Sequence, residues 1–212
     1  MRSTIAIPLI AALAAFGCSN LERSRSLANP DISAQTIALQ VCSNCHGVDG
    51  NATSPNFPNL AGQQKAYLVA QLKQFHDHSR SDPAGFEYMW GLSRSLTDAQ
   101  IEGLAEYYAA QAPKMPAEPD ATLAAEGREI YDKGLPAQEV PPCAACHGEQ
   151  GRGNEAFPGL AYQHADYIRK QLLVFQRTDE RPEGSVMKTV VHGLTERDMA
   201  AVAEFVQGFP AH

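Results

Sequence analysis

The sequence has little charge and lacks any basic run. Charged residues make up 19% of the 212 residues, and the formal net charge is -7. An acidic chain without clustered Lys and Arg is a poor candidate for binding nucleic acid or anionic lipid by electrostatic attraction. Repetitive tracts are also missing, which argues against a disordered chain. Segments of alternating polar and apolar residues are absent too, so the sequence predicts no β-strand.

The apolar run near the N-terminus is too short to predict a transmembrane helix. It covers residues 5–16, contains Pro8 and follows an N-terminal arginine. These features are typical of the core of a secretory signal peptide. We therefore predict a signal peptide over residues 1–17 and a flexible linker over residues 18–30, and we expect a periplasmic protein.

Cys18 directly follows this predicted signal. The segment Ala15-Phe16-Gly17-Cys18 resembles the lipobox of bacterial lipoproteins, in which the cysteine becomes the lipidated first residue. Ordinary signal-peptidase cleavage is the alternative, because Ala15 and Gly17 also suit that enzyme. An unpaired thiol is a liability in an oxidising compartment, which favours lipidation of Cys18 and anchoring of the protein to a membrane.

The other four cysteines belong to a duplicated pattern with a unit of about 100 residues. Residues 42–47 (CSNCHG) return as residues 143–148 (CAACHG), and residues 57–61 (FPNLA) return as residues 157–161 (FPGLA). A unit of this length is a domain rather than one repeat of a stacked array. The sequence therefore predicts two related domains.

A proline-rich segment separates the two halves. Pro113, Pro116 and Pro119 favour an extended connector, because proline cannot continue a helix. We therefore predict a first domain over residues 31–113, a linker over 114–120 and a second domain over 121–212.

Both halves are predicted to be helical. Thr97 and Gln100 have the spacing of a capping box ahead of an apolar stripe, and Thr195 takes the same place in the second half. Apolar spacing predicts a middle helix around residues 67–75 and 167–175, and another helix precedes each C-x-x-C pair. The predicted fold class is all-α.

The C-x-x-C-H motif indicates covalent haem. Two thiols three positions apart reach the two vinyl groups of one haem and form thioethers, and the adjacent histidine is held under the iron. A zinc site and a thioredoxin-like redox pair also use C-x-x-C, but neither requires the following histidine. We therefore predict two haem c groups. The residues assigned to them are Cys42, Cys45, Cys143 and Cys146, with His46 and His147 as proximal ligands.

The duplication also selects the second axial ligands. Met89 and Met187 stand at equivalent places, each seven residues before the Leu-Thr that opens the last helix. Met199 falls on an apolar stripe and is expected in the core, whereas Met115 lies in the linker. A thioether opposite imidazole raises the reduction potential, and it closes the iron to substrates.

The remaining histidines have no counterparts in the other half. We expect them on the surface rather than as ligands. They are His76, His78, His164, His192 and His212. The carbonyl groups of Pro58 and Pro158 are expected to accept the free N–H of the proximal imidazoles, as such carbonyls often do.

Together these motifs resemble the cytochrome c4 family, whose members carry two haems in two class I cytochrome c domains. The pattern runs from about residue 35 to 208, and Tyr162 departs from it where the family has glycine. Single methionines also stand where a Met-Met pair is common, and a lipobox is not typical of the family. The resemblance implies two tandem class I domains, His/Met ligation of both haems, and a contact between the haems.

The expected function is therefore to carry single electrons between redox proteins, with no catalytic residue. The resemblance implies a terminal oxidase as acceptor, and we expect a quinol-oxidising complex or a dehydrogenase as donor. One alternative is the cytochrome subunit of a dehydrogenase, such as a flavocytochrome that oxidises sulfide. Another is a dihaem enzyme such as a peroxidase, which requires an iron that is open to substrate.

Overall fold

The computed structural model describes residues 27–154 and 157–209. Cys18, the predicted signal peptide and His212 lie outside these residues. The described chain is built of short helices and two isolated β-bridges, with no strand in that part. No helix in it has the length and apolar character needed to cross a membrane.

The first half contains two longer helices and several single turns. The α-helices are α2 (Ala34–Ile37), α3 (Ser43–His46), α4 (Lys65–His76), α5 (Trp90–Ser93) and α6 (Asp98–Ala109). Two π-helical turns, η1 (Ala38–Cys42) and η2 (Gly85–Met89), lie between them.

The second half repeats this order with a longer first helix. Its α-helices are α7 (Ala121–Lys133), α8 (Ala144–His147), α9 (Ala165–Arg177), α10 (Ser185–Val191) and α11 (Glu196–Gln207). Two 3-10 turns, η3 (Pro136–Gln138) and η4 (Pro182–Gly184), complete it. The predicted all-α class is confirmed.

The capping boxes form as the sequence predicts. In α6, Thr97 Oγ1 accepts the backbone N–H of Gln100 at 3.2 Å, and Gln100 Oε1 accepts that of Thr97 at 3.0 Å. In α11, Thr195 and Asp198 make the same exchange at 3.2 and 2.8 Å. Each box satisfies two helix-terminal N–H groups that have no partner within the helix.

Each half has its own apolar core. In the first half α6 packs against α2 and α4, and Ile101 and Leu104 are 2% exposed. In the second half α11 packs against α7 and α9, and Met199 is fully buried there, as expected. Gly127 allows the close approach of α7 and α11, because a Cβ at this position would lie 2.0 Å from the carbonyl oxygen of Ala201.

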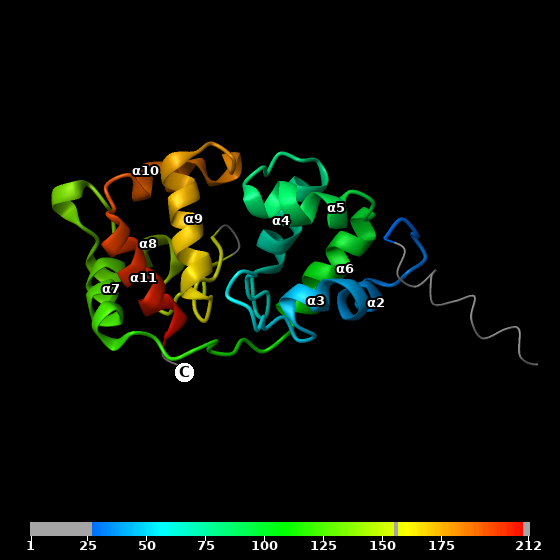
Figure 1. Cartoon of the computed structure of the whole chain (residues 1–212), viewed down its shortest axis with the longest axis horizontal. Coiled ribbons are helices and arrows are strands. Elements are labelled where there is room, and N and C mark those ends of the chain that lie inside the picture. Colours follow the sequence, from blue (N-terminus) through cyan, green and yellow to red (C-terminus); the bar gives the residue numbers. More distant parts are fainter. Residues whose placement is uncertain (1–26, 155–156, 210–212) are drawn as a thin grey trace, which may run out of the picture.

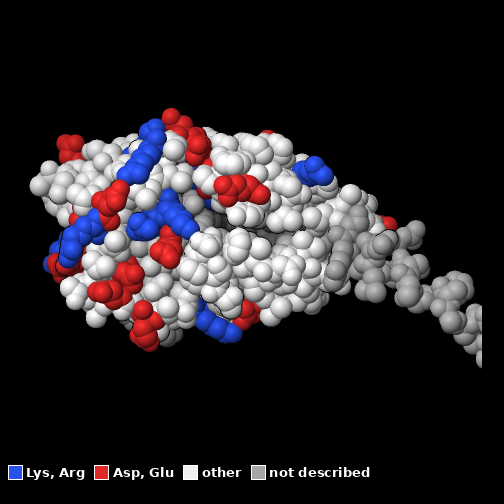
Figure 2. All heavy atoms as spheres, viewed as in Figure 1, with Lys and Arg blue, Asp and Glu red and all other residues white. Residues whose placement is uncertain are grey.

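The two halves lie side by side. Helix α4 of the first half and helix α9 of the second lie on their inner sides, and the connector runs along one edge of the pair (Figure 1). Charged side chains are denser over the second half than over the first on the face that Figure 2 shows. The hydrogen bonds that join the halves lie on these inner sides. Some of them involve the loops that follow each C-x-x-C-H motif.

Candidate haem sites

Each C-x-x-C-H motif lies on one helical turn. Cys42 ends η1 and leads into α3, and Cys143 is the N-cap of α8 in the second half. Helical i, i+3 spacing brings the two thiols of each pair to one side of the turn. None of the four cysteines forms a disulfide, so all four can form thioether bonds. Burial raises the pKa of Cys42 and of Cys143 to about 11.

A glycine with positive φ ends each of these turns. Gly47 has φ of 77° and Gly148 has φ of 81°. A side chain is strained in this region of backbone space. At Gly47 a Cβ would also lie 2.4 Å from the carbonyl oxygen of Asn51. The chain therefore turns away immediately after each histidine.

The proximal histidines have the same surroundings in both halves. His46 and His147 are 9% and 6% exposed. His46 Nδ1 lies 2.9 Å from the carbonyl oxygen of Pro58, and His147 Nδ1 lies 2.9 Å from that of Pro158, as expected. A carbonyl oxygen only accepts, so Nδ1 carries the proton and Nε2 keeps its lone pair for a metal.

Burial keeps both imidazoles neutral. It lowers the pKa of His46 and of His147, and the bonds to the proline carbonyls offset this only in part. A neutral imidazole is the form that binds iron. Phe57 meets the His46 ring edge-on with centroids 6.2 Å apart, and Phe157 meets His147 at 6.1 Å. The thiols and the neutral imidazoles therefore suit haem c.

The predicted methionine ligands are both partly buried. Met89 is the last residue of η2, and Met187 lies in the first turn of α10. The hydroxyl of Ser93, which is buried, donates to the carbonyl oxygen of Met89 at 2.7 Å and ties the turn to α5. Met115, in the connector, is 42% exposed.

One expectation about the other histidines is wrong. His76, His78 and His192 are exposed. His164, however, is only 5% exposed. It is the N-cap residue of α9 at the junction of the halves, where Nε2 donates to the carbonyl oxygen of Ala52 at 2.9 Å. Helix α9 faces the first half, so its N-terminus is covered.

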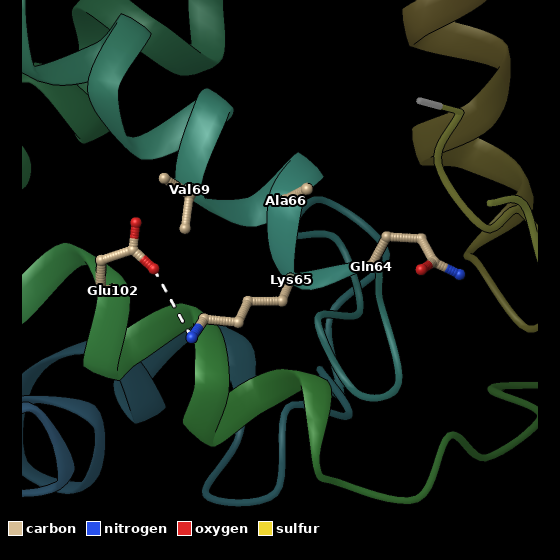
Figure 3. A pocket seen from close by; sticks show the side chains of 5 residues that line it. All are labelled: Gln64, Lys65, Ala66, Val69 and Glu102. Atoms are coloured by element: carbon tan, nitrogen blue, oxygen red, sulfur yellow. Dashed lines mark ion pairs between the residues drawn. The ribbon is translucent and has the colours of Figure 1, made fainter. Parts of the chain in front are cut away.

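A pocket in the first half lies away from the predicted ligands. Its lining comes from α4, the residue before it, and α6, and Lys65 Nζ lies 3.5 Å from Glu102 Oε2 across it (Figure 3). None of its lining residues is a predicted haem residue. Within the described chain, no three His, Cys, Asp or Glu side chains gather as a metal-binding group.

A buried polar cluster joins the halves, and no motif in the sequence pointed to it. Arg80 donates to Gln71 Oε1 at 2.6 Å and to Gln171 Oε1 at 3.4 Å. Arg181 donates to the same two oxygens. The guanidinium groups of Arg80 and Arg181 stack on Phe75 and on its counterpart in the second half, at 4.4 and 4.6 Å. These residues recur in the second half, with an offset of 100 for Gln71 and Phe75 and of 101 for Arg80, and this recurrence is the signal that could have revealed them.

Asp82 is the buried carboxylate of this cluster. It is 1% exposed. Its carboxylate accepts hydrogen bonds from Arg80 Nε at 2.8 Å and from Arg80 Nη2 at 3.2 Å. Burial raises its pKa, but the hydrogen bonds and charge of Arg80 and the charge of Arg181 outweigh this and hold the pKa below its ordinary value. The carboxylate therefore stays ionised at neutral pH.

Comparison with known proteins identifies the class of the molecule. The cytochrome c family model matches residues 33–110 and again residues 124–209. The chain is thus a c-type cytochrome with two cytochrome c domains in tandem. Cytochrome c4 from Pseudomonas aeruginosa is 36% identical over 182 residues, which are 84% of this chain and 88% of that protein.

Solved structures agree with this class. The crystal structure of reduced recombinant cytochrome c4 from Pseudomonas stutzeri has a TM-score of 0.74 and 34% identity, covering 84% of this chain and 97% of its own. A thiosulfate dehydrogenase from Marichromatium purpuratum has a TM-score of 0.70 and 31% identity, over 89% of this chain and 40% of its own.

The chain belongs to the cytochrome c4 family. It is an electron-transfer protein rather than an enzyme, and it carries two covalently bound haem c groups. The predictions of family, fold class and cofactor are confirmed.

Proposed function

We propose that this cytochrome carries single electrons through the bacterial periplasm towards a terminal oxidase. The observation that carries the proposal is the equivalence of the two proximal sites. His46 and His147 are both buried, neutral and bonded through Nδ1 to a proline carbonyl at 2.9 Å. Two equivalent sites in one chain suit the transfer of electrons rather than the binding of a substrate.

We assign the haem residues that the two C-x-x-C-H motifs and the paired methionines predict. Each haem supplies an iron that takes up and releases one electron. Attachment is assigned to the four thiols and proximal ligation to the two histidines, whose rings are fixed by the proline carbonyls. The second axial position is assigned to Met89 and Met187. These assigned residues are Cys42, Cys45, His46, Met89, Cys143, Cys146, His147 and Met187.

We infer that partners dock beside the methionine turns. Phe86 and Tyr88 precede Met89 and are 54% and 53% exposed, and Val186 precedes Met187 at 57%. Apolar side chains gathered in one exposed patch are typical of contact surfaces for other proteins, and Phe86 and Tyr88 lie on one turn. The donor in this proposal is a quinol-oxidising complex or a dehydrogenase.

We also infer that Cys18 anchors the protein to a membrane. The lipobox-like segment and the unpaired thiol support this assignment. The linker over residues 18–30 would let the two domains reach membrane-bound partners.

Reoxidation by membranes tests the function. The holoprotein is reduced with ascorbate, freed of reductant and mixed in air with membranes of the source organism. We expect reoxidation that depends on the membranes and stops with cyanide, an inhibitor of haem-copper oxidases. Equal rates with and without membranes would contradict delivery to an oxidase.

A second function is favoured by one observation. The match to the thiosulfate dehydrogenase from Marichromatium purpuratum covers 89% of this chain but only 40% of that one. A cytochrome of this kind could therefore form one part of a larger dehydrogenase. In that case the cytochrome, purified from its source without a tag, would co-elute with a dehydrogenase in size-exclusion chromatography.

A further inference from the structure

One peptide group in the first domain contacts both a proximal histidine and the other domain. The carbonyl oxygen of Pro58 accepts His46 Nδ1–H at 2.9 Å. The N–H of the same peptide group belongs to Asn59 and donates to Gln163 Oε1 at 2.8 Å. Gln163 lies in the second domain and is 6% exposed.

The second domain has the mirror arrangement. The carbonyl oxygen of Pro158 accepts His147 Nδ1–H at 2.9 Å, and the N–H of Gly159 donates to Gln63 Oε1 at 2.8 Å. Each proximal histidine is therefore linked, through one peptide group, to a glutamine of the other domain.

The hydrogen bonds fix the orientation of both glutamine amides. Gln63 Nε2 donates to the carbonyl oxygen of Gly159 at 2.9 Å, and Gln163 Nε2 donates to that of Asn59 at 2.9 Å. Gln63 Oε1 also accepts the N–H of the next residue at 2.9 Å, and Gln163 Oε1 does so at 3.1 Å. If either amide were flipped, its NH2 group would face the peptide N–H groups, and two donors would meet. The Oε1 atoms therefore face these N–H groups.

Hydrogen bonds that are linked in series strengthen one another. A peptide whose N–H is bonded has a more negative carbonyl oxygen, because hydrogen bonds in series polarise one another. That oxygen draws the imidazole proton more strongly and makes the imidazole a more basic ligand. A more basic ligand favours ferric over ferrous iron and lowers the reduction potential.

We propose that each glutamine lowers the reduction potential of the haem in the opposite domain. Gln163 acts on the haem held by His46, and Gln63 acts on the haem held by His147. Both are positioning residues that act through a peptide group. The inference rests on the proposed assignment of these histidines as iron ligands.

Gln63→Leu and Gln163→Leu in the holoprotein test this proposal. Each haem is followed separately in a redox titration through its hyperfine-shifted methyl signals in the NMR spectrum, assigned by contacts to Phe57 or Phe157. We expect Gln63→Leu to raise the potential of the second-domain haem, with a change of about two- to fivefold in the ferric-to-ferrous ratio at fixed potential. Gln163→Leu should do the same to the first-domain haem.

Gln64→Leu is the matched control. Gln64 points from the start of α4 towards the second domain, where Nε2 donates to the carbonyl oxygen of Arg152 at 2.9 Å (Figure 3). The control also removes a hydrogen bond that a glutamine makes between the domains. The peptide group it bonds to is not one whose carbonyl oxygen accepts the Nδ1–H of a proximal histidine. It should leave both potentials within the error of the wild-type values.

A shift confined to the domain of the substitution, or shifts no larger than in Gln64→Leu, would overturn the proposal. If a leucine variant fails to fold, Gln63→Met and Gln163→Met preserve side-chain length and give the same test. Failure of the ligand assignment itself is distinguishable, because the wild-type protein would then lack two low-spin haems.

Discussion

Replacing Asp82 with asparagine should weaken the junction of the two domains. Asp82 and Arg80 are 1% and 3% exposed, and two hydrogen bonds of 2.8 and 3.2 Å join them. Removing one partner of a buried ion pair costs about 3–5 kcal/mol, because the other charge stays buried. Asparagine still offers one oxygen to Arg80, so we expect a loss of about 3 kcal/mol in the free energy of unfolding at pH 7.

The size of this loss should depend on pH. The pKa of Asp82 is held below its ordinary value in the folded state, so its contribution is present above the unfolded pKa of about 3.9. The contribution disappears as pH falls through the lower, folded pKa. The stabilities of wild type and Asp82→Asn should therefore begin to converge as the pH falls below about 4.

Urea unfolding of the holoproteins, followed by far-ultraviolet circular dichroism between pH 7 and 3, measures this difference. Urea is preferred because an ionic denaturant screens charges. Asp132→Asn is the control, because Asp132 forms an exposed ion pair with Arg128 at 3.5 Å. This substitution should lower the free energy of unfolding by less than about 1 kcal/mol. A difference between wild type and Asp82→Asn that stays constant down to pH 3, or that equals the control, would refute the reasoning.

Three further substitutions follow from the structure. Gly127→Ala should cost about 1–3 kcal/mol in thermal or urea unfolding, because its Cβ meets backbone at 2.0 Å, whereas Gly91→Ala meets nothing within 4 Å and should not destabilise. Tyr162→Gly should be neutral or stabilise by up to about 1 kcal/mol, since Tyr162 has φ of 62°; a clear loss would show that the side chain matters more than the strain. Cys18→Ser should move the mature protein from the membrane fraction to the soluble periplasm, and an unchanged distribution would count against lipidation.

The duplicated pattern allowed much of the local structure to be predicted. Helical caps depend on residues three positions apart, so Thr97 and Thr195 were recognisable, and the proline carbonyls could be matched to the histidines. Comparing the halves also separated Met199, now seen fully buried, from the assigned methionine ligands.

The junction between the domains could not be predicted in the same way. A repeat shows that two positions are equivalent, but it does not show that they touch. Gln63 and Gly159 are 96 residues apart, and Gln163 and Asn59 are 104 apart. His164 was wrongly expected at the surface for this reason, because its burial depends on how the halves pack.

The packing also shows where the duplication is broken. Ser81 N–H donates to the carbonyl oxygen of Glu180 across the junction at 2.9 Å. The equivalent of Ser81 in the second domain is Pro182, which has no N–H to donate. The two domains are therefore joined by a contact that is only approximately symmetric.

Visible spectra of the purified mature protein test the central assignment most directly. They are recorded in the oxidised and reduced states, with haem quantified per chain and carbon monoxide added to the reduced form. We predict two low-spin haems per chain, the weak far-red band of ferric methionine-ligated iron, and no change with carbon monoxide. A high-spin component, or carbon monoxide binding at one haem, would show that Met89 or Met187 is not a ligand.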